Sequence, residues 1–178
     1  VSEYAFTPTT VIGAPAAGGG TPFEAVNLLT GKRINSMVGD GTSTVFHLDS
    51  KNIDSVESVT VDGVEKTATT DYTVDLAAGT VTFTTAPAES AAGGGIDNVV
   101  IAFTKTVPGY QDRIEKCTIA EFYGYNNDNR LFFSGNPDYQ NWDWQSGLDD
   151  PTYFPDTGYT KVGADTSAIM GYIKQYDA

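Results

Sequence analysis

The residues best suited to chemistry lie in an acidic and aromatic stretch between Arg130 and Lys161. No basic residue falls between these two positions, and the stretch carries Asp138, Asp143, Asp149, Asp150 and Asp156. Oxygen ligands at this density could bind Ca²⁺, which takes about six to eight oxygens in a flexible geometry. The spacing departs from the regular calcium-loop pattern, and aspartate also shapes turns. Calcium binding and turn formation therefore both stay open.

Aromatic side chains among these aspartates suggest a second chemistry. Trp142 and Trp144 stand two residues apart, so a strand would place both on one face, with Tyr139 and Tyr153 nearby. Paired carboxylates beside an aromatic wall occur in glycosidases, and the rings alone could stack on sugars. The same spacing also fits packing in a core. These four aromatic residues are the predicted interaction surface, and no catalytic, metal-binding or cofactor-binding residue is assigned.

The usual nucleophiles and bases are scarce. His47 is the single histidine, and it lies between Phe46 and Leu48 on the opposite, solvated side of an extended run. Cys117 is the single cysteine, which excludes a disulfide within the chain and predicts a buried, apolar thiol. The run around Ser134 lacks the first glycine of a nucleophile elbow. We therefore predict that the protein is not an enzyme.

Composition restricts the classes of partner. The chain has 178 residues, with 10 basic and 23 acidic side chains and a net charge of -13. This charge opposes sequence-independent binding of nucleic acid, which requires Lys and Arg on phosphates. The 40% hydrophobic content indicates a folded protein. No run of about 18 apolar residues occurs, so no membrane span is predicted.

The stretch from Gly39 to Thr106 alternates between apolar and polar residues. Successive side chains of an extended chain point to opposite faces, so each run has one dry and one wet face. The dry set comprises Phe46, Leu48, Val59, Val61, Tyr72, Val74, Leu76, Val81, Phe83, Val99, Ile101 and Phe103. Asp62-Gly63 and Ala78-Gly79 supply the positive φ of tight hairpin turns. We predict an all-β protein with a small antiparallel β-sandwich over residues 39–106.

The flanking segments differ from this block. Residues 1–38 are rich in proline and glycine and are predicted to form an extended, loop-rich leader that docks on the C-terminal part. Pro108-Gly109 marks the other boundary. Residues 107–178 hold strand-like runs at 117–125, 130–134, 142–146 and 169–176. This succession predicts an antiparallel meander like one blade of a β-propeller, continuing beyond the fragment.

Several motifs resemble structural proteins of tailed bacteriophages and of prophages in Gram-positive bacteria. The leader from Tyr4 to Leu29 is similar to a run in such proteins. Asn129 to Pro137, Trp144 to Gly147 and Asp150 to Pro155 resemble the blade pattern of tail-hub and packaged-DNA-stabilisation proteins, which are built around a β-propeller. Gly39 to Phe46, with Val-Asp-Gly and Asp-Tyr-Thr-Val after it, resembles β-sandwich modules of phage tails and fibres. Such hubs are much longer than this chain, which indicates a fragment.

The resemblance implies a non-enzymatic structural component of a virion, in the tail or neck, made in the cytoplasm of the bacterial host. Its partners would be other virion proteins in a homo-oligomeric ring, with DNA passing nearby without specific binding. It implies no cofactor, no membrane and no catalytic residue. The alternative is a carbohydrate-binding or adhesion module on a phage tail tip or bacterial surface, with Trp142, Trp144, Tyr139 and Tyr153 stacking on sugar rings.

Overall fold

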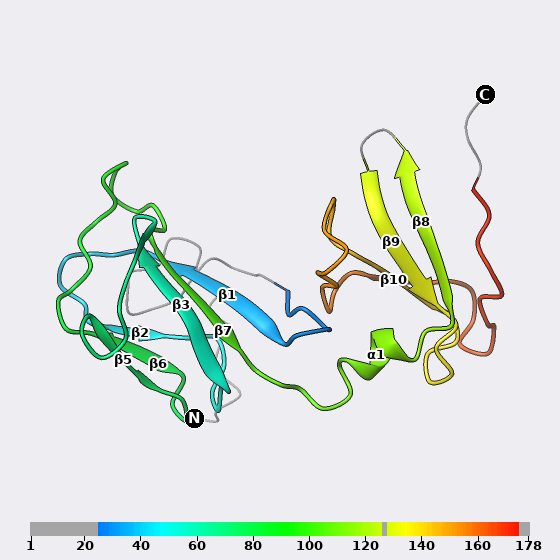
Figure 1. The fold of residues 1–178 in the computed structure, drawn as a ribbon, viewed down its shortest axis with the longest axis horizontal. Helices are drawn as coiled ribbons and strands as arrows, with labels where there is room; N and C mark the ends of the chain where they lie inside the picture. The colour runs from blue at the N-terminus through cyan, green and yellow to red at the C-terminus, as the bar shows by residue number, and fades with distance from the viewer. Residues whose placement is uncertain (1–24, 126–127, 175–178) are drawn as a thin grey trace. The chain divides into compact units, whose positions relative to one another are not determined.

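The computed structural model describes residues 25–125 and 128–174 and confirms the all-β prediction. In this part of the chain, three open antiparallel sheets and the short helix α1 (Asp112–Glu115) make up the regular structure. The chain divides into two compact units (Figure 1). We call Lys32–Thr106 the sandwich unit, and Ala25–Gly31 together with residues 107–174 the meander unit. Residues 1–24 of the predicted leader lie outside the described residues.

The sandwich unit consists of two antiparallel sheets, with the strand orders β1-β7-β3-β4 and β2-β6-β5. The strands are β1 (Lys32–Met37), β2 (Val45–His47), β3 (Ser55–Val61), β4 (Val64–Glu65), β5 (Tyr72–Asp75), β6 (Thr80–Phe83) and β7 (Val99–Thr104). The alternating runs of the sequence coincide with these strands, except that Leu48 and Leu76 lie just beyond the ends of β2 and β5. The prediction of a β-sandwich is therefore confirmed.

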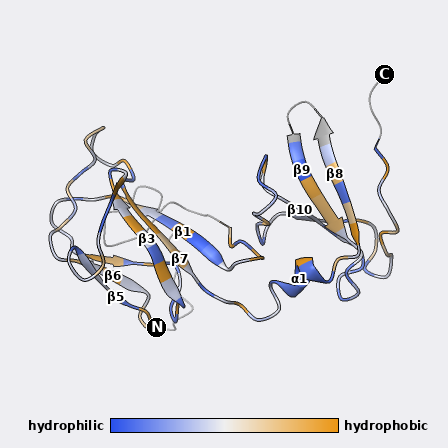
Figure 2. Cartoon of the chain, in the orientation of Figure 1, coloured by the Kyte–Doolittle hydropathy of each residue, from blue (hydrophilic) through white to orange (hydrophobic). Residues whose placement is uncertain are grey.

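Both sheets of the sandwich unit contribute to a single hydrophobic core. Its buried members are Met37, Phe46, Leu48, Ile53, Val59, Tyr72, Val81, Phe83, Val99, Ile101 and Phe103. The rings of Phe46 and Phe83 meet edge to face at 5.3 Å. Figure 2 shows β7, between β1 and β3, coloured hydrophobic over most of its length. Leu76 is 43% exposed, contrary to the prediction, because β5 ends at Asp75 and the alternation stops there.

Two glycines of the sandwich unit are required by its turns. Asp62 (φ 48°) and Gly63 (φ 74°) join Val61 to Val64 in a two-residue turn with positive φ at both positions, as the sequence predicts. Gly79 has a φ of 68°, and a Cβ at this position would collide with the carbonyl oxygen of Ser50. Any other residue there would be strained and would push the loops apart.

The sandwich unit begins at Lys32, earlier than the expected boundary at Gly39. Strand β1 pairs with β7 along its whole length, from Lys32 opposite Thr104 to Met37 opposite Val99. The sequence hides this strand because its buried position 35 is polar: Asn35 is 5% exposed, and its Oδ1 accepts the N–H of Asp49 at 2.9 Å. The chain therefore enters and leaves the sandwich unit at neighbouring strand ends, as an insertion within the meander unit.

The meander unit is built on a sheet of four strands in the order β11-β10-β9-β8. The strands are β8 (Ile119–Tyr125), β9 (Asp128–Ser134), β10 (Trp142–Gln145) and β11 (Tyr159–Lys161). Neighbours in the chain are neighbours in the sheet, which is the connectivity of one propeller blade. The strand predicted at 169–176 is wrong for residues 169–174, which form no strand; the fourth strand is β11, too short to show alternation. A propeller stays a prediction.

The segment Ala25–Gly31 belongs to the meander unit although the sandwich unit follows it in the chain. Leu28 N–H donates to Phe154 O at 2.8 Å, and Asp156 N–H donates to Val26 O at 2.9 Å. Leu28 then joins Ile114, Trp144 and Phe154 in the buried core of this unit. Of the predicted leader (residues 1–38), the structure thus describes this segment, which belongs to the meander unit, and Lys32–Met37, which form β1 of the sandwich unit.

Candidate interaction site

Strand β10 points Trp142 and Trp144 to the same face of the meander sheet, as their spacing predicts. Trp144 is 0% exposed and packs with Leu28, Ile114 and Phe154. Its ring is therefore a core residue and is not available to a ligand in this structure. Trp144 is therefore buried and cannot be part of the predicted interaction surface.

Trp142 is partly buried and contacts rings and a cation on several sides. Tyr159 stacks on it at 4.2 Å with an interplanar angle of 13°, and Tyr139 lies 4.8 Å away. Lys161 Nζ lies over the ring, 4.6 Å from its centroid. Because a stacked ring covers one face and a cation lies over the ring as well, these contacts fix Trp142 between β10 and β11.

A groove of about 530 Å³ opens beside these rings. Tyr139, Trp142 and Lys161 line it together with Asn141, Asp165 and Thr166. Asn141 Nδ2 donates to Asp165 Oδ1 at 3.3 Å, which ties the two walls together. Aromatic rings combined with amide, carboxylate and hydroxyl groups are the chemistry that recognises a polar, ring-shaped ligand such as a sugar.

Tyr153 has a different role from the other predicted aromatic residues. Its hydroxyl donates to Ala25 O at 3.0 Å, and its ring lies where a Cβ at Gly147 would be 2.9 Å away. Tyr153 therefore holds the segment 25–31 against the turn at Gly147. Of the four predicted interaction residues, the structure brings Tyr139 and Trp142 to the groove.

The acidic residues of the predicted calcium stretch take separate structural roles. Asp138 accepts from Lys116 Nζ at 3.1 Å, and Asp149, with a φ of 56°, accepts from Asn129 Nδ2 at 2.8 Å. Asp150 accepts from the hydroxyl and the N–H of Thr152, which lowers its pKa. Within residues 25–125 and 128–174, no group of three His, Cys, Asp or Glu side chains could hold a metal ion.

Asp143 lies between the two tryptophans in sequence but points to the opposite face of the sheet. Its Oδ1 accepts a hydrogen bond from the hydroxyl of Tyr172 at 2.5 Å. Burial raises the pKa of Asp143, and the Tyr172 hydrogen bond offsets part of this rise. The pKa of Tyr172 is raised by burial and by the same contact. The sheet thus separates this carboxyl from the aromatic wall that a glycosidase would need.

The surroundings of Cys117, Ser134 and His47 do not favour nucleophilic catalysis. Cys117 Sγ donates to Arg113 O at 3.1 Å, and burial, followed by the charge of Asp143, raises the pKa of the thiol to about 11. Ser134 is 0% exposed. His47 is exposed on β2, as predicted, in a different unit from Cys117.

Sequence reasoning missed the role of residues 169–174, which we call the C-terminal strap. Tyr172 contacts Asp143 on β10 and lies 6.5 Å from the ring of Phe132 on β9. Lys174 Nζ forms an ion pair with Glu121 on β8 at 2.7 Å, which lowers the pKa of Glu121. The run that contains Tyr172 and Lys174 predicted a strand. In the structure this segment forms no strand and instead contacts β8, β9 and β10 through these two side chains.

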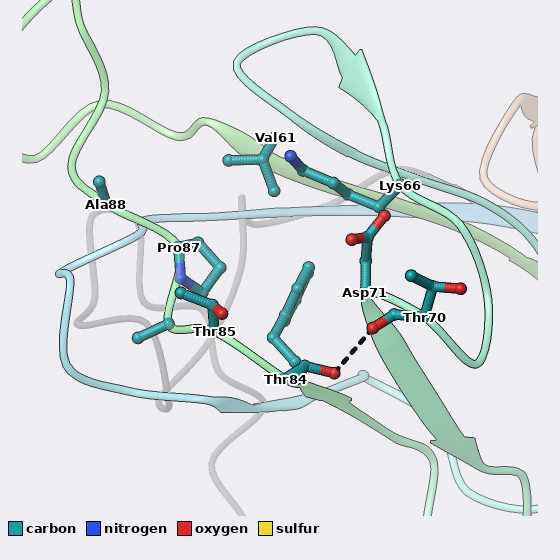
Figure 3. Close-up of a pocket in the computed structure, with 10 residues that line it drawn as sticks. Val61, Lys66, Thr70, Asp71, Thr84, Thr85, Pro87 and Ala88 are labelled. Carbon is teal, nitrogen blue, oxygen red and sulfur yellow. Dashed lines mark hydrogen bonds between the residues drawn. The ribbon is translucent and has the colours of Figure 1, made fainter.

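A second cavity, of about 340 Å³, lies in the sandwich unit. Figure 3 shows Lys66 and Asp71 along one side of it and Pro87 on another. Asp71 Oδ2 accepts Thr67 N–H at 2.7 Å, and Thr84 Oγ1 donates to Thr70 O at 3.0 Å. These contacts stabilise the loop before β5, so its polar groups serve the fold.

Comparison of the chain with protein families, with curated proteins and with solved structures finds no match. The resemblance to phage structural proteins therefore stays a prediction. Among the described residues, no helix is both long enough and apolar enough to cross a membrane.

Proposed function

We propose that this protein is a non-enzymatic structural component of a bacteriophage virion, located in the tail or neck, that acts by protein–protein assembly. The observation that supports this most is that the side chains suited to ligand binding or catalysis are engaged in the fold. Trp144 and Tyr153 are committed to packing, and Asp143 is turned away from the tryptophans. Within residues 25–125 and 128–174, each of the three sheets nevertheless ends in edge strands without a further strand beside them, and such an edge is a surface for strand pairing with another chain.

The inserted sandwich unit suits a structural role. Its two ends lie on paired strands, with Lys32 opposite Thr104, so it can be carried by the meander unit without interrupting that unit's core. The excess of acidic residues repels phosphates, so passing DNA would not be held. We expect no complex with double-stranded DNA in a gel-shift assay at physiological salt.

Labelling of the intact particle tests the virion assignment. Antibodies raised against the sandwich unit should mark the tail or neck in electron microscopy, and the gene should lie beside portal, connector or tape-measure genes. Unlabelled particles, with the protein found only in the host lysate, would contradict the proposal.

A second candidate function, carbohydrate binding, is favoured by the groove beside Tyr139 and Trp142. A sugar would have to displace Lys161 to reach the face of Trp142 that this cation covers. A glycan array separates the two functions. The control is Tyr110→Ala, which removes a ring that lies outside the groove lining and contacts Arg113 at 4.3 Å. Specific binding that Trp142→Ala removes and Tyr110→Ala retains would favour the adhesion module, whereas an array without binding favours assembly.

A further inference from the structure

Among the residues that the structure describes, strand β8 forms an edge of the meander sheet, because β9 is its one neighbouring strand there. Leu131, opposite Phe122, directs its backbone toward Ser146: its N–H donates to Ser146 Oγ at 3.0 Å, and its carbonyl accepts Ser146 N–H at 2.9 Å. Backbone groups alternate sides along an antiparallel pair, so the Phe122 N–H points out of the sheet. The same alternation directs Ala120 and Gly124 outward.

One carboxylate oxygen covers this outward donor. Glu121 Oε1 accepts the N–H of Phe122 at 3.1 Å and also the ammonium of Lys174 at 2.7 Å. Lys174 Nζ lies 6.0 Å from the ring centroid of Phe122, which is 50% exposed. A cation from the C-terminal strap therefore lies on both the carboxylate and the ring at the sheet edge.

In the part of the chain that the structure describes, the strap is held mainly by polar contacts. Ile169 N–H donates to Gln140 O at 3.0 Å, and Tyr172 and Lys174 supply the contacts to Asp143, Phe132 and Glu121. Its large apolar side chains gain little from docking, since Met170 is 87% exposed and Ile173 94% exposed. A segment held mainly by polar contacts at the surface opens more easily than a core strand.

We propose that the strap is a removable guard on the edge of β8, and that Lys174 occupies the place of a lysine or arginine from a basic β-strand of a partner protein. On release, a carbonyl of the incoming strand would accept the Phe122 N–H, and its cation would pair with Glu121. The net charge of -13 favours a basic partner over a second copy, because two copies would bring like charges together. The inference rests on the proposed function only in taking the ligand to be a protein.

Peptide binding to the isolated, full chain tests this guard. The probe is a fluorescein-labelled peptide of about eight alternating lysine and valine residues. Lys174→Ala should bind it about fivefold more tightly than the unaltered chain, and bound peptide should slow hydrogen exchange at the Phe122 amide. Lys174→Arg keeps the cation and should behave like the unaltered chain. Lys51→Ala removes an exposed lysine from the sandwich unit and controls for the loss of one positive charge.

A second pair of variants separates the edge from general charge attraction. In the Lys174→Ala chain, Glu121→Gln should remove most of the gained affinity, whereas Glu115→Gln, on α1, should leave it. Equal affinities of Lys174→Ala and Lys51→Ala, or equal effects of Glu121→Gln and Glu115→Gln, would overturn the proposal. Self-association of Lys174→Ala without peptide-dependent protection of Phe122 would also overturn it and identify a second copy as the occupant. Because the isolated chain is used, these results are independent of the location in a particle.

Discussion

The two units build their cores in different ways. In the sandwich unit, two sheets cover each other, and nearly every core side chain comes from a strand. In the meander unit, a single sheet is covered on one face by Leu28, Ile114 and Phe154, none of which lies on its strands. A sheet without a facing sheet must fix the segments that cover it. We therefore expect side-chain hydrogen bonds to contribute more to the stability of the meander unit than to that of the sandwich unit.

Buried amides hold the covering segments of the meander unit. Asn27 Nδ2 donates to Thr152 O at 2.9 Å, and its Oδ1 accepts the N–H groups of Leu29 and Phe154. Asn136 Nδ2 donates to the carbonyls of Asp112 and Arg113, both at 3.0 Å, which fixes α1. Side-chain amides thus replace the second sheet as the means of holding this core closed.

The largest expected effects come from removing a central side chain from each core. Phe103→Ala and Trp144→Ala truncate residues that are 0% exposed, and each should lower the free energy of unfolding of its own unit by about 3–5 kcal/mol. Hydrogen exchange followed by mass spectrometry measures both units in one chain. Loss of protection in both units from either substitution would contradict the expectation that each substitution destabilises only its own unit.

The reactivity of Cys117 tests whether water reaches the core of the meander unit. Burial and the charge of Asp143 raise its pKa to about 11, so iodoacetamide at pH 8 should modify it about a hundredfold more slowly than an exposed thiol. Mass spectrometry over time gives the rate. Urea that unfolds the meander unit should restore the ordinary rate. A fast reaction in the folded chain would mean that this core is open to water.

Asn27→Ala sharpens the assignment of Ala25–Gly31 to the meander unit. The substitution leaves the N–H groups of Leu29 and Phe154 without their acceptor, so it should lower the stability of the meander unit by about 1–3 kcal/mol. Asn35→Ala is the matched control, because its side chain accepts the N–H of Asp49 inside the sandwich unit. Urea unfolding monitored at the tryptophans, both in the meander unit, should respond to Asn27→Ala alone.

The sandwich could be predicted from the sequence because alternation is a local signal. Phe46, Val81 and Phe103 each belong to a run in which apolar residues recur at every second position. The residue types of Asp62-Gly63 predict the turn that these two residues form. The sequence did not predict strand β1, because the buried Asn35 occupies an inward position where an apolar residue is expected. The side chain of Asn35 accepts the N–H of Asp49, which belongs to a later segment of the chain. Non-local hydrogen bonds of this kind leave no pattern in a short window.

The site was less predictable because its residues depend on which face and which edge they occupy. The spacing of Trp142 and Trp144 correctly placed them on one face, but burial of Trp144 depends on Leu28 and Phe154 from other segments. The strap contact of Lys174 with Glu121 joins positions whose pairing depends on how the chain crosses the sheet. Neither contact follows from periodicity.

The smallest predicted effects separate two aspartates of the meander unit by their response to pH. Burial raises the pKa of Asp143, so its contribution to stability is fully present at low pH and is lost as pH rises through its raised pKa. Asp143→Asn should therefore gain stability relative to the unaltered chain as pH rises from about 3.9, the ordinary aspartate pKa, toward 7. The difference at pH 7 should be below about 1.5 kcal/mol, because an amide oxygen can still accept the Tyr172 hydroxyl.

Asp150 should respond with the opposite sign. The hydroxyl and N–H of Thr152 lower its pKa, so its contribution is present above the ordinary aspartate pKa and is lost as pH falls through the lowered value. Asp150→Asn should therefore lose stability relative to the unaltered chain as pH rises from 3 through about 3.9, the ordinary aspartate pKa, and should change little above it. Thermal unfolding of both variants between pH 3 and pH 7 measures the two slopes. Slopes of the same sign would mean that Asp143 is hydrated, and that the C-terminal strap does not cover this face of the sheet in solution.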